Sequence, residues 1–176
     1  WIDDDDIEIL AKRRVKTIHN INSNLKIASG YRFKYKELKE AGIVVSLGTD
    51  GCASSNNLDM LETMKTTALV QKAWRKDPTV LPMEELLSLS TLNGGLSLGL
   101  ETGIIKEGYL ADLSLVDVNS VAFTPNINFL ANLIYSANSS CIDTVICDGN
   151  ILMENKKIDE EEEIIQMVNK LYKKLL

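Results

Sequence analysis

The carboxylate of Asp50 follows a short apolar run and lies between two glycines, in the stretch Val44-Val45-Ser46-Leu47-Gly48-Thr49-Asp50-Gly51. A run of β-branched and aliphatic residues predicts a buried strand, and sheets of parallel strands present functional side chains where such a strand ends. An aspartate there can hold a metal ion or move a proton, while Gly48 and Gly51 let the backbone bend and approach a ligand closely. Asp50 is therefore the first candidate for chemistry. The alternative is that it only caps the helix that follows.

The single histidine, His19, closes a second run, residues 14–19, which alternates and is rich in Val, Thr and Ile. This pattern predicts a strand that delivers His19 to the same rim as Asp50, if the two strands are parallel neighbours. His19 is thus a second active-site candidate, because histidine is the commonest metal-binding side chain. The alternative is a neutral histidine that is hydrogen-bonded to a loop carbonyl.

The segments around these two strands predict helices and loops. Residues 3–13 open with carboxylates and close with basic side chains, which complements a helix macrodipole. Residues 20–34 predict a polar loop, in which Asn22, Ser23 and Asn24 can cap, turn or bind a ligand. Residues 35–41 then predict a short helix that ends at the next glycine.

The residues after Asp50 predict a polar loop over 52–57 and then two helices. Asn57 is expected to cap a helix beginning near Leu58. A second helix is expected over 83–92, with the Asn93-Gly94-Gly95 sequence breaking or loosening the turn after it. The first of these helices has apolar residues at helical spacing, which are expected in the core: Leu58, Leu61, Met64, Ala68 and Leu69.

From Leu100 onward the apolar period changes to that of strands. The alternation around 113–115, the run 145–147 and the following Asp148-Gly149 predict short strands and a tight hairpin, with a helix over 129–135 between them. Residues 159–176 predict an amphipathic helix with an acidic start, a basic end and an apolar face made of Ile164, Ile165, Val168, Leu171 and Leu175.

Composition excludes several classes of protein. The 176 residues are 45% hydrophobic and carry a net charge of −6, which argues against a nucleic-acid partner. No apolar run is long enough to cross a bilayer, and the first residues lack the features of a secretory signal, so we expect a cytoplasmic protein without membrane contact. The three cysteines form no CxxC pair and are expected to be buried, reduced thiols.

Several separated motifs together resemble the amidohydrolase superfamily, and within it the branch of methylthioadenosine/S-adenosylhomocysteine deaminases that includes the 5′-deoxyadenosine deaminases. The resemblance covers nearly the whole chain. The motifs are His19-Asn20, Ser23-Asn24-Leu25-Lys26-Ile27-Ala28-Ser29-Gly30, Gly48-Thr49-Asp50-Gly51-Cys52-Ala53-Ser54, Asn57-Leu58-Asp59-Met60, Gln71-Lys72, Asn93-Gly94, Leu98-Gly99-Leu100 and Gly103-Ile104-Ile105-Lys106-Glu107-Gly108-Tyr109-Leu110-Ala111-Asp112-Leu113.

The resemblance implies an α/β fold in three parts. Residues 1–100 would be the last part of a TIM-like (β/α)8 metal-dependent hydrolase barrel, residues 101–158 strands of a small composite β-sandwich domain, and residues 159–176 a terminal helix. It also implies one divalent metal ion, zinc being expected, which the family holds with about three histidines and an aspartate. With one histidine and no initial methionine, the chain is expected to be the carboxyl-terminal part of a longer enzyme and inactive alone.

The implied activity is hydrolytic deamination of adenosine-type nucleosides to inosine-type products and ammonia, in the salvage of S-adenosylmethionine by-products. The substrates would be 5′-deoxyadenosine, 5′-methylthioadenosine, S-adenosylhomocysteine or adenosine. Asp50 would ligate the metal, contact the substrate and take a proton. His19 and Ser54 are further substrate-binding candidates, and His19 is placed outside the metal shell because the family's histidine at this position is not a ligand.

The implied partners are the nucleoside, the missing amino-terminal part of the same polypeptide and further copies in a homo-oligomer. Two alternatives stay open. One is a related hydrolase that removes an amino or chloro group from a triazine or guanine-type ring. The other is a non-catalytic fragment or regulatory module, against which an upstream HxH motif in the reading frame would decide.

Overall fold

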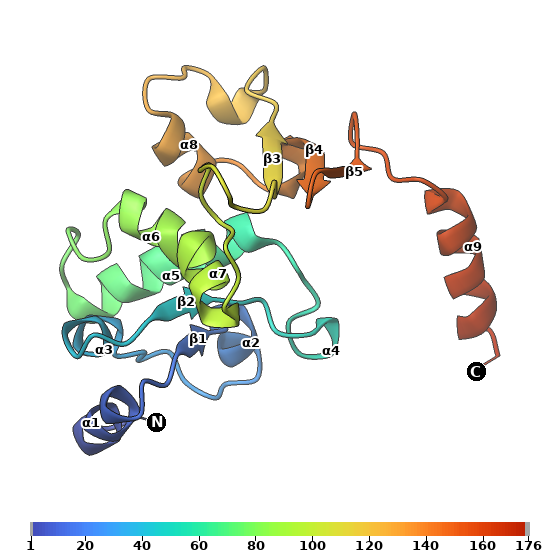
Figure 1. The fold of residues 1–176 in the computed structure, drawn as a ribbon. Helices are drawn as coiled ribbons and strands as arrows, with labels where there is room; N and C mark the ends of the chain where they lie inside the picture. Colours follow the sequence, from blue (N-terminus) through green and yellow to red (C-terminus); the bar gives the residue numbers. More distant parts are fainter. Residues whose placement is uncertain (1, 175–176) are drawn as a thin grey trace.

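The computed structural model describes residues 2–174, and Trp1, Leu175 and Leu176 lie outside the described residues. Two short strands, β1 (Thr17–His19) and β2 (Val45–Leu47), lie side by side (Figure 1). They pair in parallel, with His19 opposite Leu47. The expected parallel arrangement is confirmed. The first strand is shorter than the predicted 14–19, because Arg14 takes a left-handed φ of 54° in the turn after the preceding helix.

Helices pack around the β1–β2 pair. α1 (Asp4–Lys12) precedes β1 and α3 (Tyr35–Glu40) lies between the two strands in the chain, both close to their predicted bounds. α5 (Met60–Arg75) and α6 (Met83–Ser90) follow β2. Apolar side chains of these elements, of the adjoining loops and of the later helix α8 (Phe129–Tyr135) form one core with β2: Ile7, Tyr35, Leu38, Ile43, Val45, Leu47, Met64, Ala68, Leu81, Leu86, Leu89 and Ile134.

Two short helices occupy segments that the sequence predicted as loops. α2 (Ile21–Lys26) lies directly after β1, and α4 (Cys52–Ser55) directly after the Asp50 turn. The loop predictions for both segments were wrong. In α2 the buried side chains are Ile21 and Ser23. A polar segment of this kind has low helix propensity, so its helical form comes from tertiary packing.

A third helix, α7 (Leu92–Leu98), contains the Asn93-Gly94-Gly95 sequence that was expected to break or loosen the turn. The prediction was wrong because a glycine can serve packing as well as turns. A Cβ at Gly95 would lie 2.8 Å from the carbonyl oxygen of Thr102. The following segment therefore packs directly on the helix backbone at this position.

The start and the core face of α5 differ from the predictions. The N-cap is Asp59, whose Oδ1 accepts hydrogen bonds from the amides of Leu61 (2.8 Å) and Glu62 (3.1 Å), while Asn57 accepts one from Asp59 itself. The other oxygen of Asp59, Oδ2, accepts from the amide of Ser139 at 2.9 Å. The expected cap at Asn57 was therefore wrong by two residues.

The core face of α5 is more polar than its apolar spacing indicated. Met64 and Ala68 are buried as expected, but Leu58 and Leu69 are 61% and 51% exposed. Polar side chains, spaced four residues apart, also take buried positions along α5: Thr63, Thr67 and Gln71. Thr67 donates to the carbonyl oxygen of Thr63 (2.8 Å) and the amide nitrogen of Gln71 to that of Phe33 (2.9 Å), while Oε1 of Gln71 has no partner among the residues that the structure describes.

A small antiparallel sheet follows the helices. β3 (Leu113–Val116), β4 (Ile142–Cys147) and β5 (Asn150–Met153) pair in the order β3-β4-β5. Asp148 and Gly149 both have positive φ in the β4–β5 turn, as the hairpin prediction required. The remaining elements of this region are α8 (Phe129–Tyr135), as predicted, and the 3-10 helices η1 (Val121–Phe123) and η2 (Ser139–Cys141).

The cysteines are all free, but only Cys141 is buried, beside Phe123 and Leu133. Cys52 and Cys147 are exposed, so the prediction that all three are buried was wrong. Cys52 begins α4 and Cys147 ends β4 at the hairpin, and both elements end at the surface.

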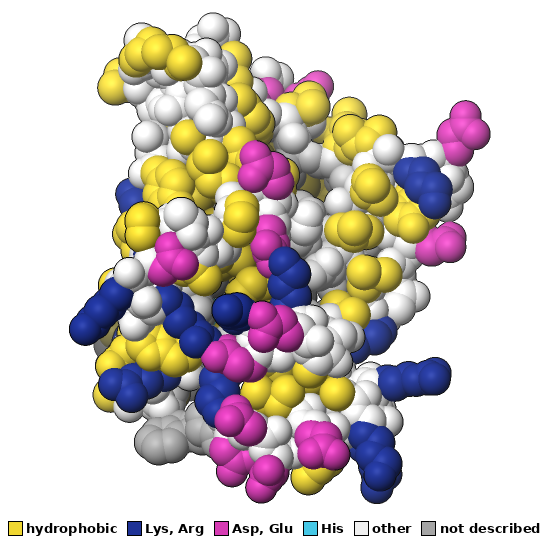
Figure 2. All heavy atoms as spheres, turned by 90° about the vertical axis from the view of Figure 1, so that its left-hand side faces the viewer, with side chains coloured by type: hydrophobic (Ala, Val, Ile, Leu, Met, Phe, Trp, Pro, Cys, Tyr) yellow, Lys and Arg dark blue, Asp and Glu magenta, His cyan; other side chains and the backbone are white. Residues whose placement is uncertain are grey.

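The predicted terminal helix is α9 (Glu161–Tyr172), which stands apart from the rest of the chain in Figure 1. Among residues 2–174, no helix combines the length and the apolar character that crossing a membrane requires. On the face shown in Figure 2, Lys and Arg side chains lie among Asp and Glu side chains, with apolar side chains between them.

Two substitutions in α5 test the observed core. Replacing Met64, which is 2% exposed, by Ala should lower the free energy of unfolding by about 2–5 kcal/mol, because a buried cavity remains. The matched control is Leu69→Ala on the exposed side of the same helix, which should change it by less than about 0.5 kcal/mol. Urea denaturation measures both. Equal losses would show that Leu69 is buried in solution.

Candidate active site at the carboxyl end of the parallel strands

Asp50 lies three residues beyond β2, in a left-handed conformation with φ 60°. Its carboxylate accepts three hydrogen bonds. Oδ2 accepts from the hydroxyls of Ser23 and Ser54, each at 2.7 Å, and Oδ1 accepts from the amide of Gly51 at 2.8 Å. The hydroxyl of Ser23, then that of Ser54, then the Gly51 amide hold the pKa of Asp50 below its usual range. The group is therefore an oriented anion at neutral pH.

The two serines come from the two short helices that the sequence did not predict. Ser23 is 1% exposed and lies in α2, and Ser54 lies in α4. Both helices begin at the carboxyl ends of the parallel strands, which is why they meet at Asp50. Ser54 was among the sequence candidates and the structure places it against Asp50. The sequence indicated Ser23 only as one of several loop residues. Its contact with Asp50 could not be predicted, because the segment that forms α2 was predicted as a loop.

The helix-capping alternative for Asp50 does not describe the observed geometry. The N-cap of α4 is Gly51, and no side chain caps that helix. The neighbouring Gly48 has a structural use. A Cβ there would lie 2.9 Å from Cγ2 of Ile18 and would overlap the side chain of Asn20. The sequence predicted that a ligand approaches the backbone at Gly48. In the structure the side chain of Asn20 occupies this place.

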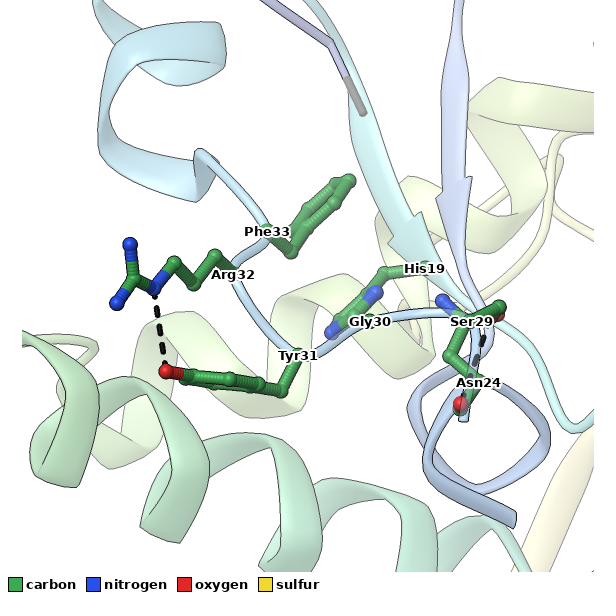
Figure 3. Close-up of a pocket in the computed structure, with 7 residues that line it drawn as sticks. All are labelled: His19, Asn24, Ser29, Gly30, Tyr31, Arg32 and Phe33. Carbon is green, nitrogen blue, oxygen red and sulfur yellow. Dashed lines mark hydrogen bonds between the residues drawn. The ribbon is translucent and has the colours of Figure 1, made fainter. Parts of the chain in front are cut away.

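His19 is 2% exposed and stacks on Phe33, with ring centroids 4.1 Å apart and planes 5° from parallel (Figure 3). Neither ring nitrogen has a hydrogen-bond partner among the residues that the structure describes. The predicted alternative, a hydrogen bond to a loop carbonyl, was therefore wrong. Burial lowers the pKa of His19 to about 4, so the imidazole is neutral at pH 7, with one donor and one acceptor nitrogen.

A cavity of about 360 Å³ lies beside this imidazole, and Figure 3 shows the side chains around it. Arg32 donates from Nε to the hydroxyl of Tyr31 at 3.1 Å on one wall. Asn24 is the residue after Ser23, so α2 contributes both to this cavity and to the Asp50 cluster. The cavity is lined by His19, Asn24, Ser29, Gly30, Tyr31, Arg32 and Phe33.

The described residues do not bring enough ligands together for a complete metal site. No group of three or more His, Cys, Asp or Glu side chains that could hold an ion occurs within residues 2–174. Asp50 follows β2 and His19 ends the neighbouring strand β1, but no hydrogen bond joins their side chains within the described residues. The arrangement supplies one ionised carboxylate, which can ligate a cation or accept a proton.

Removing the Ser23 hydroxyl should raise the pKa of Asp50, because the charged carboxylate loses one of its three donors. Carbon-13 NMR titration of the Asp50 carboxyl in Ser23→Ala measures the shift. Ser55→Ala is the matched control, since the Ser55 hydroxyl donates to the carbonyl oxygens of Gly51 and Asn57. An Asp50 pKa that stays unchanged in Ser23→Ala would contradict the observed contact.

The buried imidazole of His19 should make stability depend on pH. The pKa of His19 is about 4 in the folded chain against an ordinary value of 6.5, so the unfolded chain binds the proton first and stability is lost as pH falls from 6.5 toward 4. Relative to His19→Phe, which keeps a stacking ring without titrating, the loss should approach about 3 kcal/mol. Urea denaturation between pH 7 and pH 4 measures it. Parallel pH profiles for the two proteins would contradict the neutral, buried state of His19.

Known proteins match the chain over most of its length. Residues 1–152 match the profile of the Amidohydrolase family. The chain is 48% identical over 165 residues to a 5′-deoxyadenosine deaminase of Methanospirillum hungatei, which covers 94% of this chain and 37% of that protein. It is 45% identical over 178 residues to 5-methylthioadenosine/S-adenosylhomocysteine deaminase 1 of Archaeoglobus fulgidus, covering 99% and 42%.

The fold also matches a solved structure. The crystal structure of an adenosine deaminase from Xanthomonas campestris with bound zinc superposes with a TM-score of 0.88 at 32% identity, over 96% of this chain and 39% of that one. The chain thus spans about two fifths of the length of the curated relatives it matches. The resemblance seen in the sequence motifs is confirmed, and the chain belongs to the amidohydrolase family.

Proposed function

We propose that the chain is the carboxyl-terminal part of a metal-dependent aminohydrolase that deaminates adenosine-type nucleosides. The observation that carries the proposal is the Asp50 carboxylate, which three donors keep ionised and oriented at the carboxyl end of β2. The deaminases named above support the reaction class, and two of their names point to 5′-substituted adenosines. The preferred substrates would be 5′-deoxyadenosine, 5′-methylthioadenosine, S-adenosylhomocysteine or adenosine.

Asp50 fits one position in the shell of a divalent metal ion, for which zinc is proposed. Its Oδ1 accepts a single backbone amide and keeps lone-pair capacity, and the low pKa keeps it anionic. The other ligands would come from the remainder of the full-length polypeptide, because residues 2–174 hold no group of three ligand side chains. A divalent ion, when bound, lowers the pKa of a water ligand to about 7.

The chain's own residues have distinct proposed roles. Asp50 would ligate the metal, contact the attacking water and take its proton, which an ionised carboxylate can do. Ser23 and Ser54 would fix the direction of Oδ2, and Ser54 would also lie near the substrate. Neither nitrogen of the neutral His19 imidazole has a partner among the described residues. The imidazole would hydrogen-bond to a substrate in the adjoining cavity and would not ligate the metal.

The proposed organisation has three parts: a barrel segment over 1–100, a β-sandwich segment over 101–158 and a terminal helix over 159–176. The open edges of the two-stranded and three-stranded sheets support completion by the remainder of the full-length polypeptide. The proposed partners are this remainder, a small nucleoside substrate and further copies in a homo-oligomer.

Asp50→Asn in the full-length protein tests this function. The neutral amide loses a metal ligand and a proton acceptor together, so ammonia release from 5′-deoxyadenosine should fall by about three orders of magnitude or more. Asp5→Asn on the exposed surface of α1 is the matched control and should retain the parent rate. Asp50→Asn activity within tenfold of the parent would refute the assignment.

His19→Ala in the same protein separates the two proposed roles. Metal content, measured by elemental analysis, should stay near stoichiometric, while turnover falls about 10–100-fold, the range for groups that act outside the ligand shell. Loss of most of the metal from His19→Ala would place this imidazole among the ligands instead.

A further inference from the structure

Thr63 is a completely buried threonine through which α5 is bonded to α2. Its side chain is 0% exposed, and α2 packs against both α4 and α5. The hydroxyl of Thr63 donates to the carbonyl oxygen of Asp59 at 3.0 Å and accepts from Nδ2 of Asn22, in α2, at 3.4 Å. The hydroxyl therefore uses its donor and one acceptor position inside the described chain, and one of the two bonds crosses between helices.

α2 depends on such contacts for its place. It has six residues, and in the described structure no side chain caps its first turn. Helices of this length are unstable alone in water, so other elements must hold it. Apart from the contact with Asp50, two side-chain hydrogen bonds leave the helix within residues 2–174, from Asn22 to Thr63 and from Lys26 to Asn56. The second pair is exposed, where water competes for its groups, so Thr63 is the buried anchor.

The anchored residue is the direct neighbour of Ser23, whose hydroxyl donates to Oδ2 of Asp50 at 2.7 Å. Successive side chains of an α-helix point about 100° apart, so a rotation of α2 about its axis would carry this hydroxyl away from the carboxylate. We propose that Thr63 is a positioning residue, which holds α2 in the rotation at which Ser23 reaches Asp50. Its effect on the reaction rests on the proposed function, in which Asp50 ligates the metal.

Thr67 lies one turn further along α5 and provides a matched comparison. It is 2% exposed, and its hydroxyl donates at 2.8 Å to the carbonyl oxygen of Thr63, within the same helix. Among the described residues its side chain makes no hydrogen bond to α2. The two threonines share the helix, the burial and a bond to the carbonyl four residues earlier, so a difference between them reports the contact with α2.

Hydrogen exchange in the metal-free, full-length protein tests the anchoring of α2. Thr63→Val removes the hydroxyl at nearly constant shape, so the amides of Asn24 and Ile27, which bond one turn back, should exchange at least about threefold faster, as expected for one lost hydrogen bond. Asn22→Ala should act alike from the other side. Thr67→Val should stay within about twofold of the parent, and Thr63→Ser, which keeps the hydroxyl, should restore the parent rates. Equal α2 exchange in Thr63→Val and Thr67→Val would overturn the proposal.

A double-mutant cycle tests the connection to Asp50. In the full-length protein Thr63→Val should weaken zinc binding, measured by chelator competition, about threefold or more, below the 10–100-fold range for a direct partner of a ligand. In the Ser23→Ala background the same change should weaken it by less than about twofold, because the group through which Thr63 acts is then absent. Equal losses in both backgrounds would contradict a role exerted through Ser23. A parent protein without zinc binding or ammonia release would refute the proposed function alone, and the α2 exchange rates would then decide the role of Thr63.

Discussion

The parallel pairing of β1 with β2 is the constraint on which the candidate site depends. Because both strands run in one direction with His19 opposite Leu47, the segments that leave them begin at the same edge. The amide of Gly48 donates to the carbonyl oxygen of His19 at 3.1 Å and extends the pairing by one bond beyond the strand. A slip by one residue would turn His19 away from Phe33 and carry Ser23 away from Asp50.

The elements that the sequence predicted well are those in which local preference and tertiary packing agree. β2 ends an aliphatic run, Val44-Val45-Ser46-Leu47, and all three of its residues are buried, and α1 has charges that match its dipole. α2, α4 and α7 were missed because their polar or glycine-containing sequences are stabilised by contacts distant in the chain. The N-cap of α5 was misplaced because Asn57 and Asp59 are both good capping residues, and only the tertiary position of the helix decides between them.

The part of the candidate site that could be predicted is the part that lies directly after a predicted strand, because functional side chains often occur there. Asp50 stood out by its position after an apolar run, and Ser54 by its place in the same motif. Ser23 could not be singled out, since its partner is 27 residues away and the segment lacked a helical pattern. The stacking of His19 on Phe33 was likewise invisible, because nothing in the spacing of the two residues indicates contact.

The two carboxylate oxygens of Asp59 join the start of α5 to η2. One oxygen fixes the first turn of α5, and the other holds η2, 80 residues later, at the entrance to β4. The docking of the small sheet and the start of the helix therefore form one cooperative unit, since loss of this carboxylate leaves donors unpaired on both sides. Only four residues lie between Ser54 and Asp59, so the residue that docks the small sheet is a near neighbour in the chain of a serine that orients the Asp50 carboxylate.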